Sequence, residues 1–102
     1  MSFGKEIEPE WVCMDGDKLR KHKTMAYDIN GHLFHVCSEG CYEYLSTHFQ
    51  TAAYKIDTIS GKKILKSDAL IGLKSKKNPD VIYFGDRQTF TKYYVLNNLP
   101  KE

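Results

Sequence analysis

Residues 25–41 read MAYDINGHLFHVCSEGC, and this stretch determines the expected fold. Asn30-Gly31 supplies the two positive-φ residues that a type I′ β-turn requires. The five residues on each side, 25–29 and 32–36, therefore predict a β-hairpin with a two-residue loop. The expected cross-strand pairs are Ile29 with His32, Tyr27 with Phe34, and Met25 with Val36.

Alternation of side chains along the hairpin predicts which face is buried. The face directed toward the core carries Met25, Tyr27, Ile29, Phe34 and Val36. The opposite face carries His35 and, if the strand continues, Cys37, so these two side chains are expected to point the same way.

A helix is expected directly after the hairpin, from about Glu39 to Phe49. Ser38 is a suitable N-cap residue, and the Glu39 carboxylate suits the positive end of the helix. Its apolar stripe consists of Tyr42, Leu45 and Phe49.

The remainder of the chain repeats this order of elements without repeating the residues. It predicts strands at 53–57, at 62–66 or 70–73, and at 81–84. A closing helix follows over 87–97, with Phe90, Tyr94 and Tyr93 directed inward. The predicted fold class is α+β, with two small ββα-type units and mainly antiparallel strands.

Length and composition favour one compact domain. The chain has 102 residues, of which 41% are hydrophobic, and a chain of this size buries roughly two-thirds of its unfolded surface. Residues 1–10 are charged, carry Pro9 and predict a flexible arm that ends at Trp11. We expect a single metal-binding domain over 11–102, with sub-units of about 11–57 and 58–98.

Charge and hydropathy limit the classes of partner. The net charge of 15 − 13 = +2 is too small to indicate nucleic-acid binding. No apolar run approaches the roughly 18 residues that span a bilayer. The sequence leaves the location and the oligomeric state open: the cell envelope or periplasm if Met1 replaced a removed leader, and the cytoplasm otherwise.

Three cysteines are the strongest chemical signal in the chain. An odd number cannot form a complete disulfide framework, so at least one thiol is free. Cys37 and Cys41 lie at the expected helix start, and side chains four apart on a helix lie close enough to bind one ion. Cys13-Met-Asp-Gly16-Asp17 resembles half of a zinc knuckle, and it joins the other two cysteines only if residues 13–17 fold over the helix start, as in a treble clef. The alternative is that the cysteines are small buried core residues.

These residues also resemble known families. Residues 11–49 resemble the TRASH and YHS heavy-metal-binding domains, through Cys13, Gly31, Phe34 and Cys37-Ser38-x-x-Cys41-x-x-x-Leu45. The second half is similar to the NosL family of copper-binding accessory lipoproteins of nitrous oxide reductase, at residues 54–57, 60–62, 67–73 and 81–84. The resemblance implies a treble-clef-like N-terminal half and a Cu(I) or related thiophilic ion bound for delivery or sensing.

The chain departs from both patterns at the ligands. Met14 follows Cys13 directly where NosL relatives show Cys-x-Met, and Asp80 follows Pro79 where they usually carry methionine. Gly16 stands where the TRASH pattern often has a second knuckle cysteine. The resulting candidate ligands are Cys13, Cys37 and Cys41, with Met14, His35, or an aspartate of the knuckle (Asp15 or Asp17) in addition.

The ligand set determines the expected metal and function. Three thiolates suit Cu(I), and three thiolates with one imidazole suit Zn(II). The first hypothesis is therefore a Cu(I) trafficking or sensing protein that receives metal from, or donates it to, another protein. The alternative is a structural zinc module that binds a protein or an anionic partner through the lysines of residues 62–77. Catalysis is not expected, because His35 and Cys37 are about 6.5 Å apart on a strand and no other catalytic motif is present.

Overall fold

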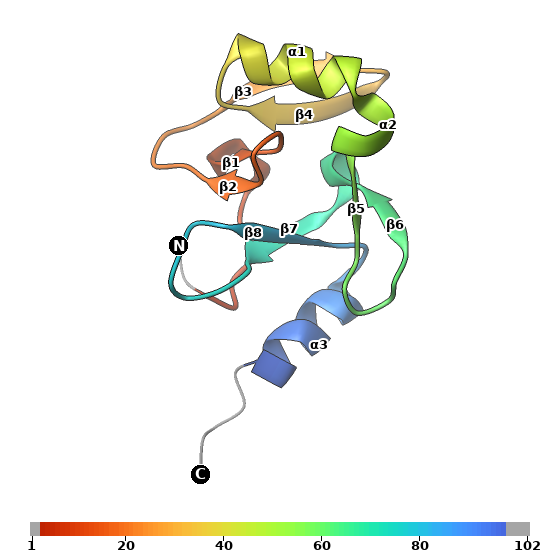
Figure 1. Ribbon diagram of the computed structural model, residues 1–102. Coiled ribbons are helices and arrows are strands. Elements are labelled where there is room, and N and C mark those ends of the chain that lie inside the picture. Colours follow the sequence, from red (N-terminus) through yellow and green to blue (C-terminus); the bar gives the residue numbers. More distant parts are fainter. Residues whose placement is uncertain (1–2, 98–102) are drawn as a thin grey trace.

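The computed structural model describes residues 3–97, and its elements form an α+β fold, as predicted (Figure 1). Those residues contain four two-stranded antiparallel sheets and three α-helices. One unit, with β3, β4 and α1, lies at the top of Figure 1, and the other, with β7, β8 and α3, lies below it.

The first unit is built on the predicted hairpin. Its elements are a 3₁₀ turn (Pro9–Trp11), β1 (Val12–Cys13), β2 (Lys18–Leu19), β3 (Met25–Ile29), β4 (His32–Val36), α1 (Glu39–Thr47) and α2 (Phe49–Ala52). All three predicted cross-strand pairs of β3 and β4 are confirmed. Asn30 and Gly31 both have positive φ, which is the backbone conformation that the turn requires. The short β1–β2 pair was not expected from the sequence.

The second unit repeats the order of strands and helix. Its elements are β5 (Tyr54–Ile56), β6 (Lys63–Leu65), a 3₁₀ turn (Lys66–Asp68), β7 (Leu70–Leu73), β8 (Val81–Phe84) and α3 (Arg87–Asn97). The sequence predicts one strand at either 62–66 or 70–73, and the structure has a strand in each range: β6 pairs with β5, and β7 pairs with β8. Phe90 and Tyr94 of α3 are buried, as expected, and Tyr93 is half-buried.

One hydrophobic core joins the two units. It includes Phe34 and Leu45 from the first unit and Ile71 and Tyr83 from the second, all at most 1% exposed. Full burial of an aliphatic or aromatic side chain contributes about 1.5–3 kcal/mol each. A second cluster of Ile82, Phe84, Phe90 and Tyr94 packs α3 against β8.

Two details of the first unit differ from the sequence prediction. Met25 was placed on the core face but is 43% exposed, because it lies at the open end of the hairpin. The predicted helix of residues 39–49 is interrupted at His48, whose φ of −107° and ψ of 37° are not helical. Phe49 therefore belongs to α2, where its ring packs edge-on against Phe34.

The described part of the predicted flexible arm, residues 3–10, is packed onto the second unit. Ile7 is 1% exposed, and its backbone N–H donates to the Ile71 carbonyl at 2.8 Å. Glu6 forms an ion pair with Arg87 of α3. The charged composition of the segment conceals this contact, because only two apolar residues carry it: Ile7 and Phe3, whose ring packs edge-on against Tyr94 with the centroids 5.0 Å apart.

Candidate metal centre

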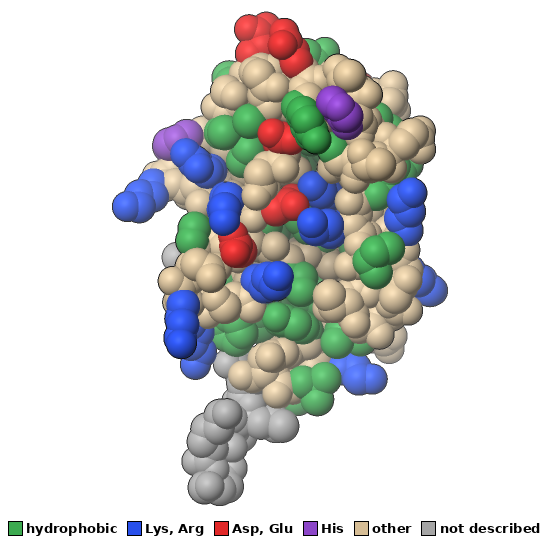
Figure 2. Space-filling model, viewed as in Figure 1, with side chains coloured by type: hydrophobic (Ala, Val, Ile, Leu, Met, Phe, Trp, Pro, Cys, Tyr) green, Lys and Arg blue, Asp and Glu red, His purple; other side chains and the backbone are tan. Residues whose placement is uncertain are grey.

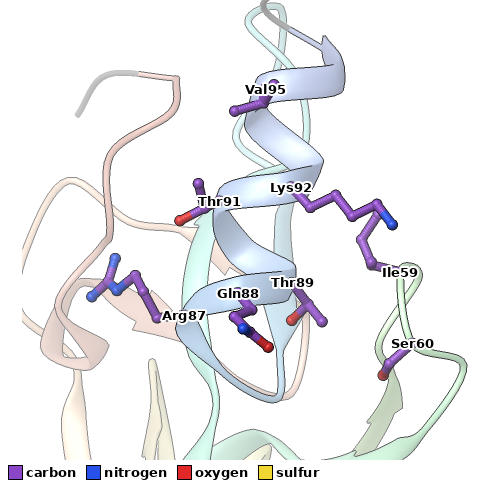
Figure 3. A pocket seen from close by; sticks show the side chains of 8 residues that line it. All are labelled: Ile59, Ser60, Arg87, Gln88, Thr89, Thr91, Lys92 and Val95. Carbon is purple, nitrogen blue, oxygen red and sulfur yellow. The ribbon is translucent and has the colours of Figure 1, made fainter.

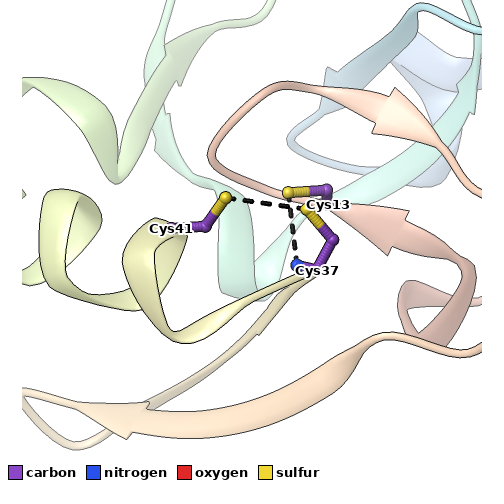
Figure 4. Close-up of side chains that lie close together, drawn as sticks. All are labelled: Cys13, Cys37 and Cys41. Carbon is purple, nitrogen blue, oxygen red and sulfur yellow. Dashed lines mark hydrogen bonds between the residues drawn. The ribbon is translucent and has the colours of Figure 1, made fainter.

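The three cysteine sulfurs converge at the junction of the β1–β2 loop, β4 and α1 (Figure 4). They all lie within 4.8 Å of one another, and the Sγ atoms of Cys37 and Cys41 are 3.6 Å apart. Three sulfurs bound at about 2.3 Å around one ion in a plane would be about 4 Å apart. The cluster is therefore compact enough to hold one metal ion.

Local structure at the start of α1 positions two of the sulfurs. Ser38 has extended backbone angles, and its Oγ accepts the Cys41 N–H at 3.2 Å. This cap turns the chain from β4 into the helix, so that Cys37 and Cys41 lie on either side of it with their sulfurs together. Both side chains are half-buried, whereas Cys13 is only 2% exposed.

Burial and hydrogen bonds shift the pKa values of Cys13 and Cys41 in opposite directions. Burial raises the pKa of Cys13, but the backbone N–H groups of Gly16, Cys37 and Asp15 donate to its sulfur, and the net result is a lowered pKa. The Cys37 N–H lies 3.4 Å from the Cys13 Sγ. The lowered pKa of Cys13 favours its thiolate, the form that binds metal.

Cys41 has the opposite character. Burial raises the pKa of Cys41 to about 12, with further contributions from the Cys37 thiol, the Cys13 charge and the Asp15 side chain, against the lowering effect of Ser38. A metal ion that binds all three sulfurs must therefore displace the Cys41 proton.

A buried lysine from the second unit fixes the loop that carries Cys13. Lys66 is 3% exposed, and its Nζ donates to the Met14 carbonyl and to Asp17 Oδ1, both at 2.8 Å. The Tyr83 hydroxyl also donates to Asp17 Oδ1, at 2.9 Å. Sequence reasoning missed Lys66, because a lysine between apolar residues is ordinary on a half-exposed sheet.

The additional candidate ligands serve other contacts. Met14 is buried, and its Sδ accepts the His35 N–H at 3.4 Å. His35 does not belong to the group of converging ligand atoms found within residues 3–97, because β4 ends at Val36 and the alternation does not continue to Cys37. Its Nδ1 is buried without a partner among the described residues, and burial lowers its pKa, against the raising effect of Glu10. Asp17 is bound to Lys66 and Tyr83, and neither it nor Asp15 joins the three sulfurs.

Charge is distributed unequally between the two units. Residues 9–53 contain six carboxylates and four basic side chains, all four within residues 18–23, a net charge of 4 − 6 = −2. Residues 55–97 contain nine basic side chains and four aspartates, a net charge of 9 − 4 = +5. Figure 2 shows the largest acidic group at the top of the molecule, further acidic side chains down to its middle, and lysines and arginines over its middle and lower parts.

A cavity of about 630 Å³ lies apart from the cysteines, between α3 and the β5–β6 loop (Figure 3). Its walls include Ile59, Thr89, Lys92 and Val95. Thr89 already donates to Asp57, and Arg87 is paired with Glu6. These side chains do not form a recognisable set of catalytic or metal-binding groups.

The chain matches no protein-family model, no curated protein and no solved structure. The resemblance to TRASH and NosL proteins therefore stays a prediction, and the three converging sulfurs alone indicate a possible metal centre. None of the helices in residues 3–97 is long and apolar enough to cross a membrane.

Proposed function

We propose that the protein binds a thiophilic metal ion, Cu(I) in the first place, through Cys13, Cys37 and Cys41. The observation that supports this proposal is the convergence of three sulfurs with no histidine or carboxylate among the ligand atoms grouped with them in residues 3–97. Soft thiolates without a fourth nitrogen or oxygen ligand favour Cu(I) over Zn(II), which prefers four ligands.

The proposed role is metal trafficking or sensing rather than catalysis. Cys37 and Cys41 are half-buried and Cys13 is buried, so a thiolate of another protein would reach a bound ion on the side of Cys37 and Cys41. Exchange of this kind proceeds through intermediates in which donor and acceptor sulfurs share the ion. The partner would therefore be a protein that delivers or receives the metal.

A structural zinc module is the second candidate. The three backbone N–H groups around the Cys13 sulfur support it, because such bonds stabilise a thiolate in any knuckle-like zinc site. The fourth ligand would then be water or a partner side chain. In that case the metal would be required for folding of the first unit.

An anaerobic competition titration of the reduced protein with Cu(I) and Zn(II) tests both candidates. We expect one equivalent of Cu(I) to bind tightly to the parent, and binding to be lost in C13S/C37S/C41S. The variants Met14→Leu and His35→Ala are matched controls, because neither side chain joins the cluster, and each should change the affinity by less than about tenfold.

The folded state is recorded in the same titration by circular dichroism. If the protein stays folded after metal removal, the result supports a carrier or sensor. If it folds only with metal and prefers Zn(II), the result supports the structural zinc module instead. Equal Cu(I) affinity of the parent and the triple serine variant would exclude both candidates.

A further inference from the structure

The loop after β5 has the same shape as the loop that carries Cys13. Cys13 pairs with Lys18 five residues later, and the Asp57 N–H donates to the carbonyl of Lys62, also five residues later, at 2.8 Å. We call Cys13 and Asp57 the anchors of the two loops. The fourth residue after each anchor has a positive φ: 56° at Asp17 and 76° at Gly61. Positive φ at the same position of two loops of equal length indicates one turn geometry.

Backbone N–H groups at equivalent positions act on both anchors within their own loops. Those of the second and third residues after Cys13, Asp15 and Gly16, lower the pKa of its thiol. Asp57 Oδ1 accepts from the second and third residues after it, Ile59 at 2.8 Å and Ser60 at 3.2 Å.

Each anchor also binds the first residue after a hairpin. The Cys37 N–H, directly after β4, donates to the Cys13 Sγ at 3.4 Å. The Gly85 N–H, directly after β8, donates to Asp57 Oδ2 at 2.8 Å. In the first unit β1 lies against β4, and in the second β5 lies against β8.

The helix that follows begins in the same way in both units. Ser38 Oγ accepts the Cys41 N–H, and Asp86 Oδ1 accepts the Thr89 N–H at 2.9 Å, in each case three residues after the cap. The side chain of that third residue then returns to the anchor. Thr89 Oγ1 donates to Asp57 Oδ2 at 2.7 Å, and the Cys41 Sγ lies within 4.8 Å of the Cys13 Sγ.

We propose that residues 57, 85 and 89 are the second unit's counterpart of the metal centre. They occupy the positions of Cys13, Cys37 and Cys41, and the Asp57 carboxylate accepts the hydrogen bonds that an anionic sulfur accepts in the first unit. The second unit is thereby closed without metal. Cysteines at these three positions would complete a second site for a thiophilic ion.

The backbone at Gly85 permits this replacement. A Cβ added there would lie 3.5 Å from Asp57 Oδ2, so a side chain at position 85 points to the anchor as Cys37 does. Its φ lies outside the positive region that favours glycine. The closest obstacle is Ile64 Cγ2, at 3.3 Å from the added Cβ, and Ile64→Val is included to relieve it.

The test grafts the site into a chain that lacks the first one. The variant carries C13S/C37S/C41S together with D57C/G85C/T89C and I64V, and its control carries the three serines and I64V alone. Both are titrated with Cd(II), because thiolate-to-cadmium charge transfer reports sulfur ligation directly. We expect one equivalent bound by the graft and none by the control. A folded graft that binds no more Cd(II) than the control would overturn the proposal.

The reciprocal exchange needs no metal and decides the outcome if the graft fails to fold. C13D/C37G/C41T places the carboxylate, glycine and threonine of the second unit into the first. Under chelating conditions we expect the urea midpoint of C13D/C37G/C41T to exceed that of C13S/C37S/C41S. The reason is that a carboxylate at position 13 can accept hydrogen bonds from the backbone N–H groups of residues 15, 16 and 37, which face the Cys13 sulfur in the parent. A lower midpoint would overturn the proposal.

The inference takes from the proposed function only that the three cysteines are a metal centre. Failure of the proposed function and failure of this inference can be told apart. If the parent does not bind Cu(I), the proposed function is excluded, but the stabilities of C13D/C37G/C41T and C13S/C37S/C41S, measured with a chelator present, still test the correspondence between the two units.

Discussion

The two units close the same junction with different chemistry. In the first, three sulfurs gather where a loop, a strand end and a helix start meet. In the second, one carboxylate, Asp57, is fully buried and accepts four hydrogen bonds there from Ile59, Ser60, Gly85 and Thr89. The difference teaches that the second closure is complete with protein groups alone, while the first leaves three converging sulfurs that are compact enough to hold a metal ion.

The largest effect is expected from removing the carboxylate. Asp57→Ala leaves three backbone N–H groups without their acceptor and removes one of the two acceptors of the Thr89 hydroxyl, and we expect a loss of about 3 kcal/mol or more in the free energy of unfolding. Urea denaturation of the metal-free protein measures it. Asp68→Ala is a matched control, because Asp68 is exposed and should change stability by less than about 0.5 kcal/mol. Equal midpoints for the two variants would contradict the role given to Asp57.

A second effect tests the link between the units. Lys66→Met removes the buried ammonium that holds the Met14 carbonyl and Asp17, and we expect a loss of about 2 kcal/mol in stability. Metal affinity should fall about tenfold, since the loop that carries Cys13 loses its support. Lys63→Met, on the exposed neighbouring strand, should leave the affinity unchanged. Unchanged affinity in both variants would show that Cys13 is positioned without Lys66.

Acid should weaken the second unit by a smaller amount. Burial raises the pKa of Asp57, but the donors of Gly85, Thr89, Ile59 and Ser60 outweigh it and hold the pKa below its usual value. A lowered folded pKa means that this stabilisation is complete above the unfolded pKa of about 4 and is lost as the pH falls through the folded value. Stability curves of the parent and Asp57→Asn between about pH 2 and 6 measure the difference. The parent's acid-dependent loss should exceed that of Asp57→Asn, and parallel curves would contradict the assignment.

The helix caps provide the smallest and sharpest comparison. Ser38→Ala and Asp86→Ala each remove one cap hydrogen bond and should each cost about 1 kcal/mol in the metal-free protein. Metal should restore stability in Ser38→Ala, because Cys37 and Cys41 lie on either side of that cap, and should leave the loss in Asp86→Ala. Thermal denaturation with and without metal checks both, and equal recovery of the two variants would contradict the comparison.

Local signals in the sequence predicted most of the elements. Asn30-Gly31 determines the register of β3 and β4, and Ser38 determines where α1 begins, because turn and cap chemistry acts over a few residues. The grouping of Cys13 with Cys37 and Cys41 could be predicted only as a condition, that residues 13–17 fold over the helix start.

What the sequence did not reveal depends on long-range contacts. Lys66 lies 52 residues from Met14, and Asp57 lies 32 residues from Thr89, so no local pattern marks either pair. The correspondence between the units was visible only as an order of elements. It rests on a set of equivalent backbone hydrogen bonds to Cys13 and to Asp57, and the sequence gives no sign of them because cysteine and aspartate are different residue types.

The unequal distribution of charge has a consequence for how the molecule meets a surface. With the carboxylates of Asp28, Glu39 and Glu43 on the β3–β4 hairpin and α1, and lysines over the other unit, the protein has a permanent electric moment. In the field of a charged surface such a body rotates before contact, which shortens the search for a productive orientation. A positively charged surface would therefore be approached with the β3–β4 hairpin and α1 in front, and an anionic one with the lysines of the second unit.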